Sequence, residues 1–134
     1  MNPNYALAAR RASHRCEYCR APEAVFKFPF EVEHIVPRIR AGADREANWA
    51  LSCRSCNLYK GDADGRDPQT GKTAPLFNPR LQEWEEHFAL DKVTGLINGL
   101  TATGRLTVAK LRMNGAAQLS ARTEWVRVKW FPIP

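Results

Sequence analysis

Residues 31–61 bring together side chains that can bind a metal ion, move a proton and contact a phosphate. Glu33 and His34 are adjacent, and Asn48 and Asn57 follow within the same stretch. A histidine with its ordinary pKa near 6.5 is a suitable general base close to neutral pH. Carboxylate and amide oxygens are ligands suited to Mg²⁺ or Mn²⁺. A metal-assisted phosphodiesterase needs such a set, and a packed core needs none of it in this order.

The cysteines form two CxxC pairs, and the sequence contains no others: Cys16 with Cys19, and Cys53 with Cys56. A reducing cytosol disfavours disulfides, so the two pairs predict a metal site rather than four free core thiols. Four thiolates complete a closed, tetrahedral structural zinc site. The 33 residues between the pairs exceed the usual zinc-ribbon spacer of about 15–20 residues. Because Glu33, His34 and Asn48 lie inside this spacer, we expect the zinc to clamp the ends of a functional insert.

The chain length favours one domain over residues 1–134, and the apolar and turn residues predict both helices and short strands. We expect helix 80–88 to bury Leu81, Trp84 and Phe88. The other elements that we expect are helices over 3–12, 55–61, 103–114 and 116–129, a long-looped hairpin over 29–52, turns over 62–79, a small hairpin over 89–101 that turns at Asn98-Gly99, and an extended tail from Trp130.

Positive charge gathers at the two ends of the chain. Residues 1–60 carry a net charge of +4 and residues 93–134 a net +5, whereas the stretch between them is acidic. A basic surface suits a nucleic-acid partner, although solubility alone would also account for it. No apolar run approaches the roughly 20 residues that span a bilayer, and the first residues lack the apolar centre of a secretory signal. We therefore expect a cytoplasmic protein with no membrane partner.

The order of these residues resembles the HNH endonucleases, a family whose fold is a ββα-metal finger. The matching pattern is Cys16-x2-Cys19, Glu33-His34-Ile35-x-Pro37, Asn48, Ser52-Cys53-x2-Cys56-Asn57 and Lys60-Gly61. It covers residues 16–61, and later segments around 67–80 and 84–88 are similar to small stand-alone bacterial members. The resemblance implies an α+β fold, a zinc-clamped ββα finger with additional helices and a small β-hairpin. In this single domain, 16–61 is the core motif and 62–134 is an accessory region.

The resemblance also implies a role for each matching residue. His34 is the expected general base that deprotonates a water, and Asn48 tethers the loop and orients the histidine. Glu33 and Asn57 are expected to hold a catalytic Mg²⁺ or Mn²⁺ ion, while zinc is structural. Aspartate is commoner than glutamate at the position of Glu33, and Asn57 stands where the founding motif has a final histidine.

The predicted function is a metal-dependent endonuclease that hydrolyses phosphodiester bonds of DNA, most simply double-stranded DNA. Lys60 and Arg54 are the expected phosphate contacts. One alternative is a non-catalytic zinc-finger module that binds nucleic acid, and a second is a zinc-stabilised protein-interaction domain. Neither alternative needs a histidine base beside two oxygen ligands, so we prefer the endonuclease.

Overall fold

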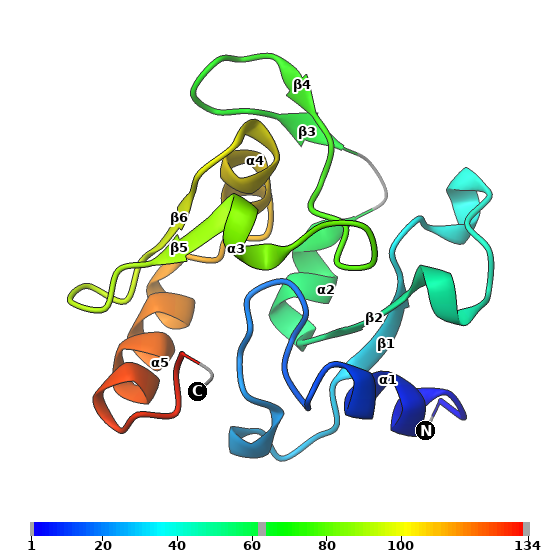
Figure 1. The fold of residues 1–134 in the computed structure, drawn as a ribbon, viewed down its shortest axis with the longest axis horizontal. Helices are drawn as coiled ribbons and strands as arrows, with labels where there is room; N and C mark the ends of the chain where they lie inside the picture. Colours follow the sequence, from blue (N-terminus) through cyan, green and yellow to red (C-terminus); the bar gives the residue numbers. More distant parts are fainter. Residues whose placement is uncertain (1, 62–63, 133–134) are drawn as a thin grey trace. The chain divides into compact units, whose positions relative to one another are not determined.

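A computed structural model describes residues 2–61 and 64–132 (Figure 1), and the chain divides into two compact units. The first unit holds the described residues up to 61 together with 78–81, and the second holds the remaining described residues. Both units combine helices with short antiparallel strands. This mixture confirms the predicted α+β class.

The first unit is built on a two-stranded antiparallel sheet with helices α1 and α2 against it (Figure 1). In this sheet His34 pairs with Trp49, and Glu31 pairs with Ser52. The predicted hairpin over 29–52 and the two predicted helices are therefore confirmed. The elements are α1 (Tyr5–Arg11), η1 (Glu23–Val25), β1 (Glu31–His34), η2 (Arg38–Arg40), η3 (Glu46–Asn48), β2 (Trp49–Ser52) and α2 (Arg54–Lys60).

Helix α1 lies close to the sheet because its buried side chains are small. Ala8 and Ala9 are fully buried, and α1 contacts both β1 and β2. Arg11, in the last turn of α1, donates to the carbonyl oxygens of Glu46 and Trp49 at 3.0 and 2.7 Å. The helix therefore fixes the start of β2, where the loop from β1 arrives.

The loop between β1 and β2 folds back onto its own beginning. A Cβ atom at Gly42 would lie 1.7 Å from the carbonyl oxygen of Val36, so only glycine permits this approach. The Gly42 N–H donates to the carbonyl of Pro37 at 3.0 Å. The residues between Gly42 and β2 are thereby held near the end of β1.

The second unit carries two short hairpins and three helices among its described residues, and α4 contacts β6 along the second hairpin. Its first hairpin, β3 with β4, lies in the stretch predicted as turns alone. The tail is described only up to Pro132, with Phe131 buried. The elements are β3 (Gly65–Arg66), β4 (Thr73–Ala74), α3 (Trp84–His87), β5 (Phe88–Leu90), β6 (Ile97–Gly99), α4 (Ala102–Lys110) and α5 (Ala116–Arg127).

The predicted turn at Asn98-Gly99 is wrong, because both residues lie in strand β6 and pair with β5. The hairpin turns at Asp91 instead: its carbonyl accepts the N–H of Gly95 at 2.7 Å, and Gly95 has a φ of 79°. Gly99 serves close packing, since a Cβ atom there would lie 2.3 Å from the backbone nitrogen of Arg105. Helix α4 can approach β6 only because this position lacks a side chain.

Two further boundaries differ from the prediction. Helix α3 begins only at Trp84, and Leu81 is 81% exposed, because the side chain of Asn78 accepts the N–H of Arg80 at 2.9 Å and bends the chain there. Thr101 caps α4, its Oγ1 accepting the N–H of Gly104 at 3.0 Å, so the helix begins at Ala102 and not at residue 103 as predicted. The Thr101 cap sets where α4 starts, whereas α3 begins after Glu83 without a side-chain cap.

Asp67 is the buried carboxylate of the second unit. Arg105 donates to both of its oxygens at 3.0 and 2.8 Å, and Thr70 donates at 3.1 Å. The hydrogen bonds from Arg105 come first among the causes that hold the pKa of Asp67 well below its ordinary value. The stabilisation is thus fully present above the ordinary pKa near 3.9 and is lost as the pH falls below it.

We expect Arg105→Gln to raise the pH at which the Asp67 carboxyl titrates, because the bidentate partner is removed. Carboxyl NMR of the full chain between pH 6 and pH 2 measures this midpoint directly. Thr70→Ala, which removes one neutral donor, is the matched control and should move the midpoint less. Equal midpoints in the wild type and Arg105→Gln would show that the ion pair does not stabilise the carboxylate.

No described helix combines the length and the apolar character needed to pass through a bilayer.

Candidate functional site

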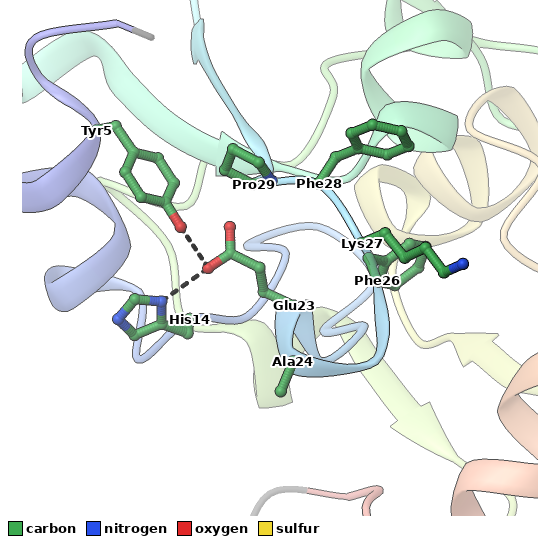
Figure 2. Close-up of a pocket in the computed structure, with 8 residues that line it drawn as sticks. All are labelled: Tyr5, His14, Glu23, Ala24, Phe26, Lys27, Phe28 and Pro29. Carbon is green, nitrogen blue, oxygen red and sulfur yellow. Dashed lines mark hydrogen bonds and ion pairs between the residues drawn. The ribbon is translucent and has the colours of Figure 1, made fainter.

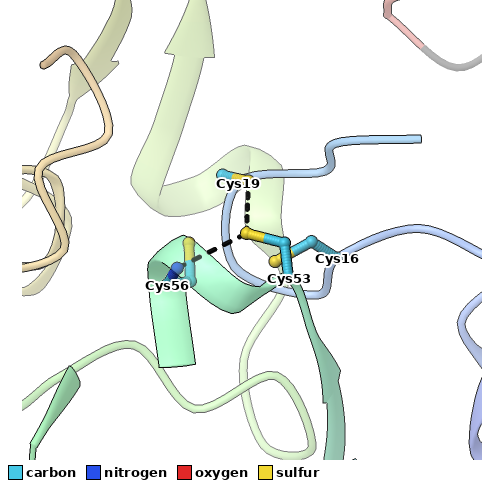
Figure 3. A group of neighbouring side chains, drawn as sticks. All are labelled: Cys16, Cys19, Cys53 and Cys56. Atoms are coloured by element: carbon cyan, nitrogen blue, oxygen red, sulfur yellow. Dashed lines mark hydrogen bonds between the residues drawn. The ribbon is translucent and has the colours of Figure 1, made fainter. Parts of the chain in front are cut away.

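The four cysteines meet in one buried cluster, although 33 residues separate the two pairs (Figure 3). Their sulfur atoms all lie within 4.8 Å of one another, and the sulfurs of Cys19 and Cys53 are 3.8 Å apart. A tetrahedral zinc ion with Zn–S bonds of about 2.3 Å places its sulfurs about 3.8 Å apart. The cluster therefore fits a structural metal such as zinc, as the sequence predicted.

Two short backbone turns aim these thiols at one point. Cys53 precedes α2 as its N-cap, and its sulfur accepts the N–H of Cys56 at 3.4 Å. In the first knuckle the N–H of Arg20, which has a φ of 64°, donates to the carbonyl of Cys16 at 2.8 Å. Glu17 joins the knuckles, because its carboxylate accepts the N–H of Leu51 in β2 at 2.8 Å. The metal would thus tie the first knuckle to the β2–α2 junction.

His34 lies at the end of β1 with its imidazole partly exposed. Its Nε2 atom is 3.0 Å from Oδ1 of Asp44, a residue of the loop between the strands. Oδ1 of Asp44 also accepts the indole N–H of Trp49 at 3.0 Å. These hydrogen bonds, first that with His34 and then that with Trp49, lower the pKa of Asp44. The carboxylate is therefore ionised at neutral pH and can only accept.

Asn48 holds the loop through both ends of its amide. Its Oδ1 accepts the N–H of Val36 at 2.8 Å, and its Nδ2 donates to the carbonyls of Val36 and Ala43 at 2.9 and 2.8 Å. Its backbone carbonyl also accepts the N–H of Ile35 at 2.8 Å. These hydrogen bonds tie the loop to the end of β1, next to His34.

Glu33 points to the opposite face of β1 from His34, as strand alternation requires. It is buried, and its carboxylate lies 3.1 Å from the ammonium of Lys60 and accepts a hydrogen bond from the hydroxyl of Tyr18. Burial raises the pKa of Glu33, while Lys60 and Tyr18 act in the opposite direction. Lys60 further donates to the carbonyls of His34 and Ile35 at 3.2 and 2.9 Å.

This placement gives Lys60 a position that the sequence did not predict. Its side chain is 4% exposed and already surrounded by three oxygen acceptors, so it faces inward rather than toward a phosphate. Arg54, at the start of α2, is exposed and remains available as the predicted phosphate contact. The buried ammonium of Lys60 instead holds the backbone carbonyls of His34 and Ile35 in place.

Asn57 is half-buried on α2, and its amide donates to the carboxylate of Glu31 rather than to that of Glu33. Within the described ranges, the cysteines are the one group of three or more His, Cys, Asp or Glu side chains close enough to share an ion. Glu33 and His34 point to opposite faces of β1, and Glu33 and Asn57 have different partners, Lys60 and Glu31. Glu33 and Asn57, as placed here, do not fit an open site for a divalent cation.

Sequence reasoning missed Asp44, Tyr18 and Glu31 as partners of the predicted site residues. Asp44 lies in the loop between β1 and β2, and Tyr18 stands between Cys16 and Cys19 in the sequence. One signal was present for Glu31: positions 31 and 33 fall on the same face of a strand, so a second carboxylate accompanies Glu33. Nothing in the local sequence indicates that the loop would return Asp44 to His34.

A recess of about 470 Å³ lies on the first unit beside Tyr5, His14 and Glu23 (Figure 2). Oε1 of Glu23 lies 2.6 Å from the hydroxyl of Tyr5 and 2.7 Å from Nδ1 of His14, and Oε2 accepts the N–H of Phe30 at 2.5 Å. Burial next to this carboxylate raises the pKa of Tyr5 to about 12. Each oxygen of Glu23 has a protein donor, so this carboxylate ties α1 and the first knuckle to the start of β1.

Comparison with known proteins agrees with the cysteine cluster and the ββα arrangement. The model of the HNH endonuclease family matches residues 16–63. No curated protein and no solved structure matches the chain. The fold and the cysteine cluster fit a zinc-clamped finger, and the segment 16–63 is similar to the HNH endonuclease family. Members of such a family act on nucleic acid, so a nuclease is the class of protein that these observations support.

Proposed function

We propose that this protein is an endonuclease that hydrolyses phosphodiester bonds of double-stranded DNA, with His34 as its general base. The observation that carries the proposal is the environment of His34 in the matched HNH segment. Nε2 faces an ionised carboxylate, and among the described residues Nδ1 has no hydrogen-bond partner. An ionised carboxylate only accepts, so Nε2 carries the proton and Nδ1 of the neutral ring keeps its lone pair.

In this proposal, Nδ1 of His34 takes a proton from a water whose oxygen attacks the phosphorus atom. The bond from phosphorus to one ester oxygen breaks, and that oxygen leaves and takes up a proton from solvent. General base catalysis of this kind contributes about 10²–10⁴-fold to a rate. Asn48 supports the step by holding the loop around the histidine, and exposed Arg54 neutralises charge on the DNA backbone. The net charge of +4 on residues 1–60 favours the same partner.

The two predicted metals differ in how well the residues fit them. The buried cysteine cluster fits zinc, which would hold the finger together without entering the reaction. Glu33 is neutralised by Lys60, so we assign no step to a cation at Glu33 and Asn57. Dependence on Mg²⁺ or Mn²⁺ rests on the family resemblance, and a cleavage assay with added metals tests it.

His34→Ala is expected to lower plasmid cleavage by at least about 10²-fold, because the proton acceptor is removed. The assay compares nicked and linear DNA formed with Mg²⁺, Mn²⁺ or chelator, with zinc content checked in every sample. His14→Ala is the matched control: it removes another histidine that pairs with a carboxylate, Glu23, and should cleave like the wild type.

Equal cleavage by the wild type and His34→Ala would remove His34 as the base. Salt-dependent DNA binding without cleavage by the wild type under any metal would support the non-catalytic zinc-finger module instead. Absence of both binding and cleavage would favour the zinc-stabilised protein-interaction domain.

A further inference from the structure

We infer that Asp44 is a positioning residue for His34: its carboxylate holds the proton on Nε2 and so directs Nδ1 toward the attacking water. This inference rests on the proposed function, since it concerns the orientation of the proposed base. Asp44 lies ten residues after His34, within the matched segment but at none of the positions that carry the resemblance.

The hydrogen bond itself determines the protonation pattern of the ring. Nε2 of His34 is 3.0 Å from Oδ1 of Asp44, within the range of an N–H···O hydrogen bond. The ionised carboxylate has no proton to give, so Nε2 must donate. The neutral imidazole then has its lone pair on Nδ1, the nitrogen without a partner among the described residues. A ring with the opposite tautomer would lose this hydrogen bond and present N–H where a base is needed.

Asp44 is itself held in place by the elements around it. Its Oδ1 also accepts the indole N–H of Trp49 at 3.0 Å, and Trp49 is a buried residue of β2 that pairs directly with His34. Asn48 donates to the carbonyl of Ala43, the residue before Asp44, at 2.8 Å. The hydrogen bonds from Trp49 and from Asn48 therefore fix the Asp44 carboxylate relative to the His34 imidazole.

The exposure of Asp44 explains why loss of its carboxylate should lower the rate of cleavage and not the stability of the fold. Asp44 is half-exposed, and exposed ion pairs contribute little to folding. Loss of a group that orients a functional histidine, in contrast, costs about 10–100-fold in activity. A positioning role thus predicts a large change in kcat with little change in Tm or KM.

NMR of the His34 imidazole tests the orientation without relying on cleavage. In the zinc-loaded wild type, at a pH where the ring is neutral, we expect a protonated Nε2 with a protected N–H signal and an unprotonated Nδ1. Asp44→Ala should lose that protected signal while zinc content and Tm remain close to the wild type. The protected signal remaining unchanged in Asp44→Ala would overturn the inference.

Kinetics with plasmid DNA give the second readout. Asp44→Ala is expected to lower kcat about 10–100-fold with KM nearly unchanged, and Asp44→Asn, which keeps an acceptor oxygen, should lose less. Arg38→Gln is the matched control, because Arg38 pairs with the other carboxylate oxygen at 3.7 Å and is exposed; it should stay within about threefold of the wild type.

The outcomes separate this inference from the proposed function. Cleavage by Asp44→Ala at the wild-type rate, in a protein where His34→Ala is inactive, overturns the inference and leaves the function standing. Absence of cleavage by the wild type overturns the function; Asp44 would then be at most a tether of the loop, which also overturns its positioning role.

Discussion

Replacing Cys53 with serine is expected to remove zinc from the chain and to unfold the first unit. Structural zinc contributes on the order of 10 kcal/mol in small domains, whereas a whole domain is stable by only about 5–15 kcal/mol. The first unit has a sheet of two four-residue strands, and the cysteines connect the first knuckle to the junction of β2 and α2. Without the metal, the hydrogen bonds between Glu17 and Leu51 would have to hold this connection.

Zinc content by mass spectrometry of the native protein and amide hydrogen exchange in β1 and β2 would measure the effect. We expect one zinc ion per wild-type chain, and none together with rapid exchange in Cys53→Ser. Amides of α4 in the second unit serve as an internal reference. Chelation followed by added zinc should reverse the change in the wild type only. Full protection of β1 and β2 in metal-free protein would show that the cluster is not a folding site.

Lys60→Met is expected to destabilise the first unit by about 3–5 kcal/mol. Removing one member of a buried ion pair leaves the other charge without compensation, and Glu33 is buried with Lys60 as its cation. The change also removes donors to the carbonyls of His34 and Ile35. Urea unfolding of zinc-loaded protein, with exchange protection in β1 as the local readout, measures the loss.

Two control variants make this result specific. Glu33→Gln combined with Lys60→Met should recover much of the stability, because the unpaired carboxylate is gone. Lys27→Met, at an exposed position of the same unit, should change the stability by no more than about 0.5 kcal/mol. Lys60→Met could instead keep its stability and reduce the slope of DNA affinity against salt concentration by about one. That result would show that Lys60 is the phosphate contact that the motif predicts.

The Lys60–Glu33 pair also bears on the metal that the resemblance implies. A cation at Glu33 would have to displace an ammonium 3.1 Å away, and the desolvated pair is not easily separated. Asn57, the other predicted ligand, already donates to Glu31. Cleavage that requires added Mg²⁺ or Mn²⁺ would show that a cation acts in spite of this ion pair. Cleavage that does not require added metal would agree with the pairing of Glu33 and Lys60.

Prediction from the sequence succeeded where local chemistry decides the structure. The CxxC pairs, the strands on either side of the His34–Asn48 loop and helix α2 follow from residue types at fixed spacings, and the family match covers this part of the chain. Prediction failed where packing decides. Asn98-Gly99 resembles a tight turn, yet Gly99 is needed for the contact between β6 and α4.

The sequence by itself determined which residues could do the chemistry, because thiol spacing and the order of histidine and asparagine are properties of the chain. Only the tertiary structure decided the partner of each residue. Strand alternation turned Glu33 inward to Lys60, and the loop fixed by Gly42 and Asn48 brought Asp44 to His34. Such pairings depend on distances across the fold, and a motif of residue types along the chain does not contain them.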